Sequence, residues 1–205
     1  MCKNMPPLEL AIQFHGHVCP GLLFGVRVAE FAQQNLGVDP DKDEEVFAVV
    51  ENDSCAVDAI QAILGCTFGK GNLIFRDYGK QVYTIASRES GRAIRIAQIF
   101  GSMDIPETKR FRQLKSMACL SPSEENELED LLSVLFEQIM SKPFDELFKW
   151  QETGMPEVEK AIILPSIECQ ICGEGVMQSR ASTTDQGLIC PACRLECEVN
   201  NNVRS

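Results

Sequence analysis

The chain has 205 residues, of which 44% are hydrophobic and 24% are charged, and this balance supports one sizeable globular domain or a main domain with a small appendage. Its formal net charge of −11 and its pI of about 4.7 disfavour binding to nucleic acid. The sequence shows neither an apolar run of transmembrane length nor a signal-peptide pattern at its start, so we expect a cytoplasmic protein without a membrane partner.

The ten cysteines are distributed unevenly along the chain. One group lies in the first 120 residues and the other in the last 40: Cys2, Cys19, Cys55, Cys66 and Cys119, then Cys169, Cys172, Cys190, Cys193 and Cys197. Without a secretory signal, metal ligation or thiol chemistry explains these cysteines better than disulfides do. Together with a polar segment rich in turn residues near 151–160, the distribution predicts two domains, residues 1–155 and 156–205.

The first predicted helix covers residues 20–37, where apolar side chains recur at helical intervals. Pro20 suits the first helical position, because its missing N–H has no partner to lose there. Cys19 is then the cap of this helix. His15 and His17, the two histidines of the chain, lie on the segment that enters it.

Shorter elements are predicted next, and they mix strands with helices. The β-branched run 46–51 predicts a buried strand, and 56–65 predicts a short helix. Residues 73–87 read as two strands around a Tyr-Gly turn, and a helix is predicted over roughly 90–100.

The strongest helix signal begins at Ser121, which forms a capping box with Glu124 ahead of an apolar face of leucines. Pro143 ends this helix, residues 144–150 predict another helical turn or two, and 161–165 predict a strand. The order of the elements indicates an α+β fold rather than a doubly wound parallel sheet.

Two Cys-x-x-Cys pairs, separated by 17 residues, mark the tail. Four thiolates can close a tetrahedral site, so we predict a structural zinc on Cys169, Cys172, Cys190 and Cys193. Iron or a redox dithiol pair is the alternative, and Cys197 could replace one of the four. The tail carries few positive charges, which favours a structural or protein-docking role over nucleic-acid binding.

A second candidate site lies in the N-terminal half. Cys19 and Cys55 both stand at helix starts, where the helix dipole is expected to lower the pKa of a thiol. With His15 and His17 they could form a metal site with an open position, or act as catalytic thiolates. Asp58 is either a supporting partner of this site or a solvated helix residue. The alternative is a polar loop beside two inert cysteines.

The loop CTFGKGN, residues 66–72, superficially resembles a phosphate loop. Its glycine spacing is one residue short, and Gly71 stands where a Ser or Thr should follow the lysine, which excludes nucleotide binding of that kind. The loop could still offer backbone N–H groups and Lys70 to an anionic cofactor group. A plain glycine turn is the favoured alternative.

The segments FHGHVCPGLLFGVR, NDSCAVDAIQAILGCTFGKGNL and RDYGK resemble the FmdE family, which takes its name from a component of the molybdenum and tungsten formylmethanofuran dehydrogenases. The resemblance implies a mixed β-sheet flanked by helices, similar to the catalytic domain of glyceraldehyde-3-phosphate dehydrogenase, and a zinc-ribbon or treble-clef tail. It also implies a homodimer. The matching residues His15, His17, Cys19 and Cys55 would line a metal pocket, with zinc the favoured ion.

Three functions remain open from the sequence. The first is a metal-binding accessory protein of formylmethanofuran dehydrogenase or related one-carbon metabolism, with oxidoreductase subunits as partners. The second is a free-standing enzyme that uses Cys19 and Cys55 as metal ligands or nucleophiles. The third is a metal or redox sensor that acts through protein partners.

Overall fold

The computed structural model describes residues 5–40, 44–159, 164–185 and 187–202. The chain divides into two compact units, residues 1–160 and 161–205, which are described separately below. Within the described residues, every helix is too short or too polar to cross a bilayer.

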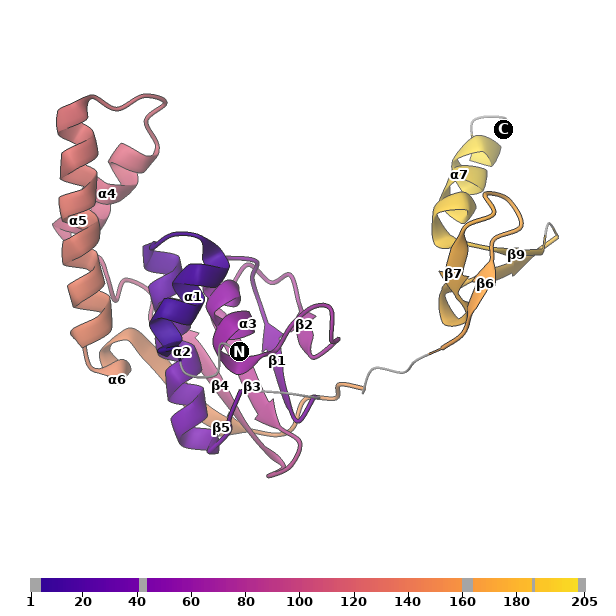
Figure 1. Cartoon of the computed structure of the whole chain (residues 1–205), viewed down its shortest axis with the longest axis horizontal. Helices are drawn as coiled ribbons and strands as arrows, with labels where there is room; N and C mark the ends of the chain where they lie inside the picture. Colours follow the sequence, from indigo (N-terminus) through magenta and orange to yellow (C-terminus); the bar gives the residue numbers. More distant parts are fainter. Residues whose placement is uncertain (1–4, 41–43, 160–163, 186, 203–205) are drawn as a thin grey trace. The chain divides into compact units, whose positions relative to one another are not determined.

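The first unit is built on a five-stranded mixed sheet with the strand order β2-β1-β3-β4-β5 (Figure 1). The strands are β1 (Val46–Val50), β2 (Leu73–Phe75), β3 (Val82–Ser87), β4 (Arg92–Gln98) and β5 (Phe148–Thr153). β1 and β2 run parallel, joined through helix α3 (Ala56–Leu64), and the other neighbouring pairs are antiparallel. The predicted α+β class and the mixed sheet are therefore confirmed.

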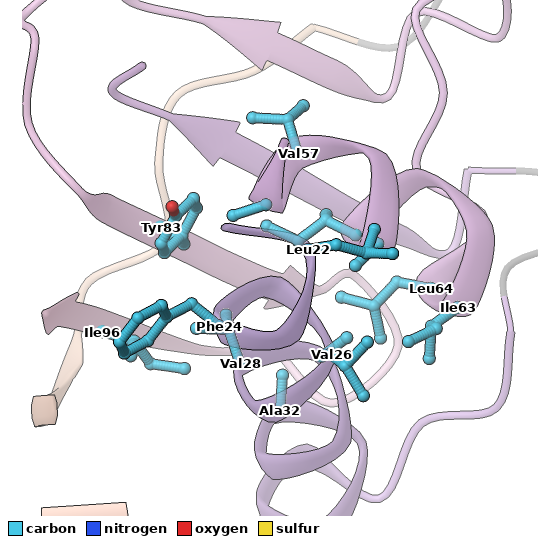
Figure 2. Packing of buried hydrophobic residues seen from close by; sticks show 14 of the residues in the cluster. Leu22, Phe24, Val26, Val28, Ala32, Val57, Ile63, Leu64, Tyr83 and Ile96 are labelled. Atoms are coloured by element: carbon cyan, nitrogen blue, oxygen red, sulfur yellow. The ribbon is translucent and has the colours of Figure 1, made fainter. Parts of the chain in front are cut away.

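Helices cover one face of this sheet (Figure 1). They are α2 (Pro20–Leu36) and α3, with α1 (Pro7–His15) packed on both of them. Between β4 and β5 follow α4 (Pro106–Lys115), α5 (Pro122–Ser141) and α6 (Phe144–Leu147), of which α5 packs on α2 and α4 packs on α5. Because side chains alternate along a strand, Ala48 and Val50 face the helices while Phe47 and Val49 face the other side. Figure 2 shows side chains of α2 and α3 gathered in one cluster with Tyr83 and Ile96 of the sheet.

A glycine sets how closely α2 approaches the start of α3. A Cβ atom on Gly25 would lie 2.2 Å from the carbonyl oxygen of Ala56, a separation at which the two helices would have to move apart. Gly25 thus permits a backbone contact that any other residue would block. This contact holds the start of α3 against α2, where both predicted helix-start thiols lie.

The interval between β4 and β5 forms a helical hairpin that is tied back to α2. Arg27 donates from Nη1 to the carbonyl oxygens of Ile139 at 2.8 Å and Met140 at 2.7 Å, and from Nη2 to that of Lys142 at 2.9 Å. These carbonyls belong to the last turn of α5 and to its C-cap, Lys142, where no helical donors are left for them. At the other end of α5, the predicted capping box of Ser121 and Glu124 is confirmed.

One prediction of secondary structure was wrong, and another was confirmed for only part of its range. The helix expected over 90–100 is strand β4, in which the isoleucines face the helices and the residues between them face the other side. Residues 144–150 begin as the short helix α6, but strand β5 starts at Phe148. In both segments, pairing within the sheet outweighs a weak local helix preference.

The strand order at the edge of the sheet also differs from the hairpin predicted over 73–87. Both strands predicted over 73–87 exist, but β1 lies between β2 and β3. Helix α1 was not predicted at all, although it carries His15 as its last residue. The strand predicted over 161–165 falls mostly outside the described residues, which resume at 164.

The second unit contains two short hairpins and a helix. Strand β6 (Ser166–Glu168) pairs with β7 (Gly175–Met177), and β8 (Ser182–Thr184) pairs with β9 (Gly187–Ile189). A single 3-10 turn, η1 (Gln178–Arg180), joins the hairpins, and helix α7 (Pro191–Asn202) follows them. The buried cluster among its described residues is small and contains three cysteines, Cys169, Cys190 and Cys193.

Candidate metal centres

The turn between α1 and α2 gathers three of the predicted front-site residues. His15 ends α1, and Gly16, with a φ of 91°, reverses the chain in the left-handed conformation that glycine adopts most easily. Cys19 is the N-cap of α2, as predicted. One ligand atom from each of His15, His17 and Cys19 lies within 4.8 Å of the others, a spacing that could hold a metal ion.

Asp58 of α3 orients the first histidine of this group. Its Oδ2 atom lies 2.7 Å from His15 Nδ1, and Gln61 Nε2 donates to its other oxygen at 3.3 Å. His15 Nε2 is thereby turned toward the Cys19 sulfur, 3.6 Å away. A carboxylate on the far nitrogen of a histidine is the usual support for a metal ligand, because it selects the tautomer and fixes the ring.

Cys55 lies beside this group rather than within it. A Cβ atom on Gly21 would stand 3.9 Å from the Cys19 sulfur and 3.8 Å from the Cys55 sulfur, so both thiols border the same point. Cys55 is nevertheless absent from the set of ligand atoms that lie within 4.8 Å of one another. The described structure therefore brings together three of the four predicted front ligands and places the fourth next to Cys19.

The helix start acts on the pKa of Cys19 in the predicted direction, but the net shift of this pKa is upward and not downward. Burial is the largest influence and raises the pKa of this thiol, and the neighbouring Cys55 raises it further. The N–H of Leu22, 3.4 Å from the sulfur, acts in the opposite direction but is outweighed. Burial therefore favours the neutral thiol of Cys19, and metal binding there would release a proton.

The front group is open to solvent on one side. The His15 side chain is 11% exposed, whereas His17 is exposed, and the two rings lie 4.5 Å apart between centroids. Two nitrogen ligands and one sulfur ligand leave one position of a tetrahedron free. That arrangement is typical of a catalytic or exchangeable metal rather than a closed structural one.

Lys70 does not join the front group. The loop that carries it follows the C-terminal end of α3, whereas Cys55 caps the N-terminal end, and a nine-residue helix spans about 13 Å. Within the loop, Thr67 accepts the N–H of Lys70 at 3.3 Å and donates its own N–H to Asn72 at 2.8 Å. These contacts organise the loop itself, as expected for a glycine turn.

The four tail cysteines form a second compact group. Their sulfur atoms all lie within 4.8 Å of one another, and those of Cys172 and Cys190 are 4.0 Å apart. Tetrahedral thiolates at the Zn–S distance of about 2.3 Å would stand roughly 3.8 Å apart, so the group fits a four-coordinate zinc. Cys197, on α7, is not part of it.

Backbone N–H groups favour the thiolate form of one tail cysteine, Cys169, which is the form that binds a cation. Those of Cys172, Cys190 and Ile171 lower the pKa of Cys169 to about 6, and the Cys190 N–H lies 3.3 Å from the sulfur. The neighbouring thiol of Cys190 and burial raise the pKa of Cys193. Four thiolates in one small cluster would repel one another, and a bound divalent cation would offset this repulsion.

Three comparisons relate the chain to known proteins. The sequence profile of the family described as "FmdE, Molybdenum formylmethanofuran dehydrogenase operon" matches residues 14–149. A protein of Archaeoglobus fulgidus named probable S-adenosyl-L-methionine-binding protein is 30% identical over 177 residues, which are 83% of this chain and 48% of that protein. The chain thus spans about half the length of this curated relative.

The fold is also similar to a crystal structure. A tungsten formylmethanofuran dehydrogenase FmdE-like protein from Syntrophus aciditrophicus superposes with a TM-score of 0.62 and 21% identity, over 91% of this chain and 89% of that one. This likeness concerns the fold. Residues 14–149, which match the family profile, include the complete front group and its Asp58 support.

Proposed function

Because the chain belongs to the FmdE family, we propose that it is a metal-binding accessory protein of a molybdenum or tungsten formylmethanofuran dehydrogenase, or of a related enzyme of one-carbon metabolism. The match to the family covers most of the first unit, and the fold likeness extends over most of the chain. In this proposal the partners are oxidoreductase subunits, and the protein itself is a homodimer.

The observation that carries the proposal is the group formed by His15, His17 and Cys19 with Asp58 behind it. Imidazole and thiolate ligands together suit zinc better than they suit magnesium or calcium. When bound, such an ion would act as a Lewis acid at its free position. The residues of this chain would supply the ligands, fix the His15 ring and shield the Cys19 sulfur.

The tail has a different place in the proposal. A zinc ion on Cys169, Cys172, Cys190 and Cys193 would leave no open coordination position. Its role is then to fold the second unit, because the buried cluster of the described residues there is too small to do so. The folded tail would serve as a docking or assembly module.

The accessory role is tested by mixing the purified full chain with a molybdenum or tungsten formylmethanofuran dehydrogenase. We expect co-elution in size-exclusion chromatography, and a change in dehydrogenase activity or metal content that Cys19→Ala abolishes. Cys119→Ala, an exposed cysteine outside both groups, is the matched control. Absence of co-elution together with unchanged activity and metal content would contradict the accessory role.

The open side of the front group favours one second candidate, a free-standing enzyme that acts on a small molecule. His17 is exposed, and three ligands leave room for a water or a substrate. Substitution with Co²⁺ separates the two candidates. Azide that changes the visible spectrum of the front-site cobalt would favour an enzyme, and a spectrum indifferent to azide would favour the accessory role.

A further inference from the structure

A cavity of about 250 Å³ lies on the face of the sheet opposite the helices. Val49, Thr84 and Arg95 line it from three neighbouring strands, where they form one cross-strand row. The chain after β5 borders it at Gly154 and Pro156. None of the metal-ligating groups found among the described residues contributes to it.

The segment that borders the cavity is held against the sheet. Val158 packs on the apolar cluster of this face, which includes Phe47 and Ala86. Arg88 donates from Nη1 to the Val158 carbonyl oxygen at 3.1 Å and lies 4.5 Å above the Phe47 ring. The cavity therefore has a defined wall on this side.

Arg95 occupies an unusual place for a cation, in the middle of the sheet. Its Nη2 atom donates to Glu51 at 3.2 Å, and the Glu51 side chain is only 12% exposed. Arg95 lies on β4 and Glu51 follows β1, so the arginine side chain extends across the intervening β3 toward the carboxylate. A guanidinium has five N–H donors, and within the described residues this contact uses one of them.

A second arginine completes the lining. Arg76 continues the β1–β2 pairing by one residue, since its N–H donates to the Val50 carbonyl oxygen at 2.9 Å, and it therefore stands opposite Glu51. Among the described residues its guanidinium has no acceptor within hydrogen-bond distance, and neither has the hydroxyl of Thr84. The cavity thus gathers two arginines, one carboxylate and the hydroxyls of Thr84 and Thr153 in a chain of net charge −11.

We propose that this cavity binds a small organic oxyanion, a carboxylate or phosphate group carried on a short carbon chain. Guanidinium groups match the geometry of both anions with paired N–H donors. Glu51 holds Arg95 in place while leaving its other donors to the ligand, and Val49 and Pro156 contact the carbon chain. The two charges of Arg76 and Arg95 exceed the one of Glu51, so the site favours an anion.

This site is independent of the front metal group. Residues of β1 alternate between the two faces, and Ala48 and Val50 pack with the helices that carry His15 and Cys19. Val49 and its row face the other way. Loss of the front metal should leave anion binding unchanged.

The test is isothermal titration of the full chain with inorganic phosphate and, separately, with succinate. We expect saturable binding of at least one of them, weakened about tenfold or more in Arg76→Gln and in Arg95→Gln. Arg112→Gln, on an exposed position of α4, is the matched control and should bind like the wild type. Arg76 is exposed, so its variant is expected to fold even if Arg95→Gln does not.

Each result bears on the proposal. Binding of phosphate alone or of succinate alone supports it and identifies the anionic group. No saturable binding of either anion up to about 10 mM overturns it. Equal binding by the wild type and Arg76→Gln, or equal loss in Arg112→Gln, overturns it as well, because the anion would then interact with the surface charge in general.

Discussion

In the front group and in the tail group alike, the metal-ligating atoms lie within 4.8 Å of one another, but the chain forms the two groups in different ways. The tail uses four identical ligands from two short pairs, and three of them are buried while Cys172 is exposed. The front uses mixed ligands at the end of one helix and the start of the next, with support from a third helix. A closed set of ligands stabilises a fold, whereas an open set with an oriented histidine can bind and exchange.

The surroundings of the two groups differ as much as their ligands do. The front group borders the large core that α1, α2 and α3 form with the sheet. The buried cluster of the described tail residues contains Ile189 and three cysteines, with Val176 packed against it. The first unit therefore has a large core without any metal, whereas we expect the second unit to need an ion on its cysteines for most of its stability.

The largest effect is expected for Cys172→Ala. Losing one thiolate opens the tail site, and zinc contributes about 10–16 kcal/mol of binding free energy to small cysteine-rich modules. We expect the tail to lose its metal and its amide protection, as measured by hydrogen exchange. The melting temperature of the first unit should change by less than about 2 °C. A larger drop there would mean that the two units stabilise each other.

Gly25→Ala should have the next largest effect, and it should act on the first unit. The added methyl group would meet the carbonyl oxygen of Ala56, so α2 and α3 must separate at a cost of roughly 1–3 kcal/mol. Calorimetry should show a lowered melting temperature. Competition with a chelator should show a lowered metal affinity of the front group. Gly69→Ala, where a Cβ atom meets nothing within 4 Å, is the control. Equal stability of the two variants would contradict the close helix contact.

Asp58→Asn should have the smallest effect on the fold and a specific effect on the front group. An amide supports the metal-binding tautomer of His15 less well, and loss of such support typically lowers metal affinity by about 10–100-fold. Competition with a chromogenic chelator measures this change. Asp53→Asn, an exposed residue before the same helix, should bind like the wild type. Identical metal affinities in the two variants would mean that Asp58 is a solvated helix residue that does not support His15.

Local patterns in the sequence predicted much of this structure. The capping box at Ser121, the Pro20 helix start and the two Cys-x-x-Cys pairs each depend on neighbours within a few residues. The helix predicted over 90–100 was wrong because the structure of that segment depends on residues far away in the sequence. Arg95, in the middle of this segment, pairs with Glu51, which is 44 positions away in the sequence, so local patterns do not indicate its place in a sheet.

The same distinction applies to the candidate sites. His15, His17 and Cys19 come together within five residues, so their pattern could be read directly. The pKa of Cys19 could not be predicted in this way, because the burial of its thiol and the proximity of Cys55 depend on how the helices pack. Arg27 gave no local signal that it would bind the end of α5, more than 110 residues later.

The most direct test of this account is elemental analysis of the purified full chain beside its Cys19→Ala and Cys119→Ala variants. We expect two metal ions per chain in the wild type and in Cys119→Ala, and one in Cys19→Ala, which should remain folded. One metal ion per chain in all three proteins would contradict it. That result would confine metal binding to the tail and leave the histidines of the front group without an ion to hold.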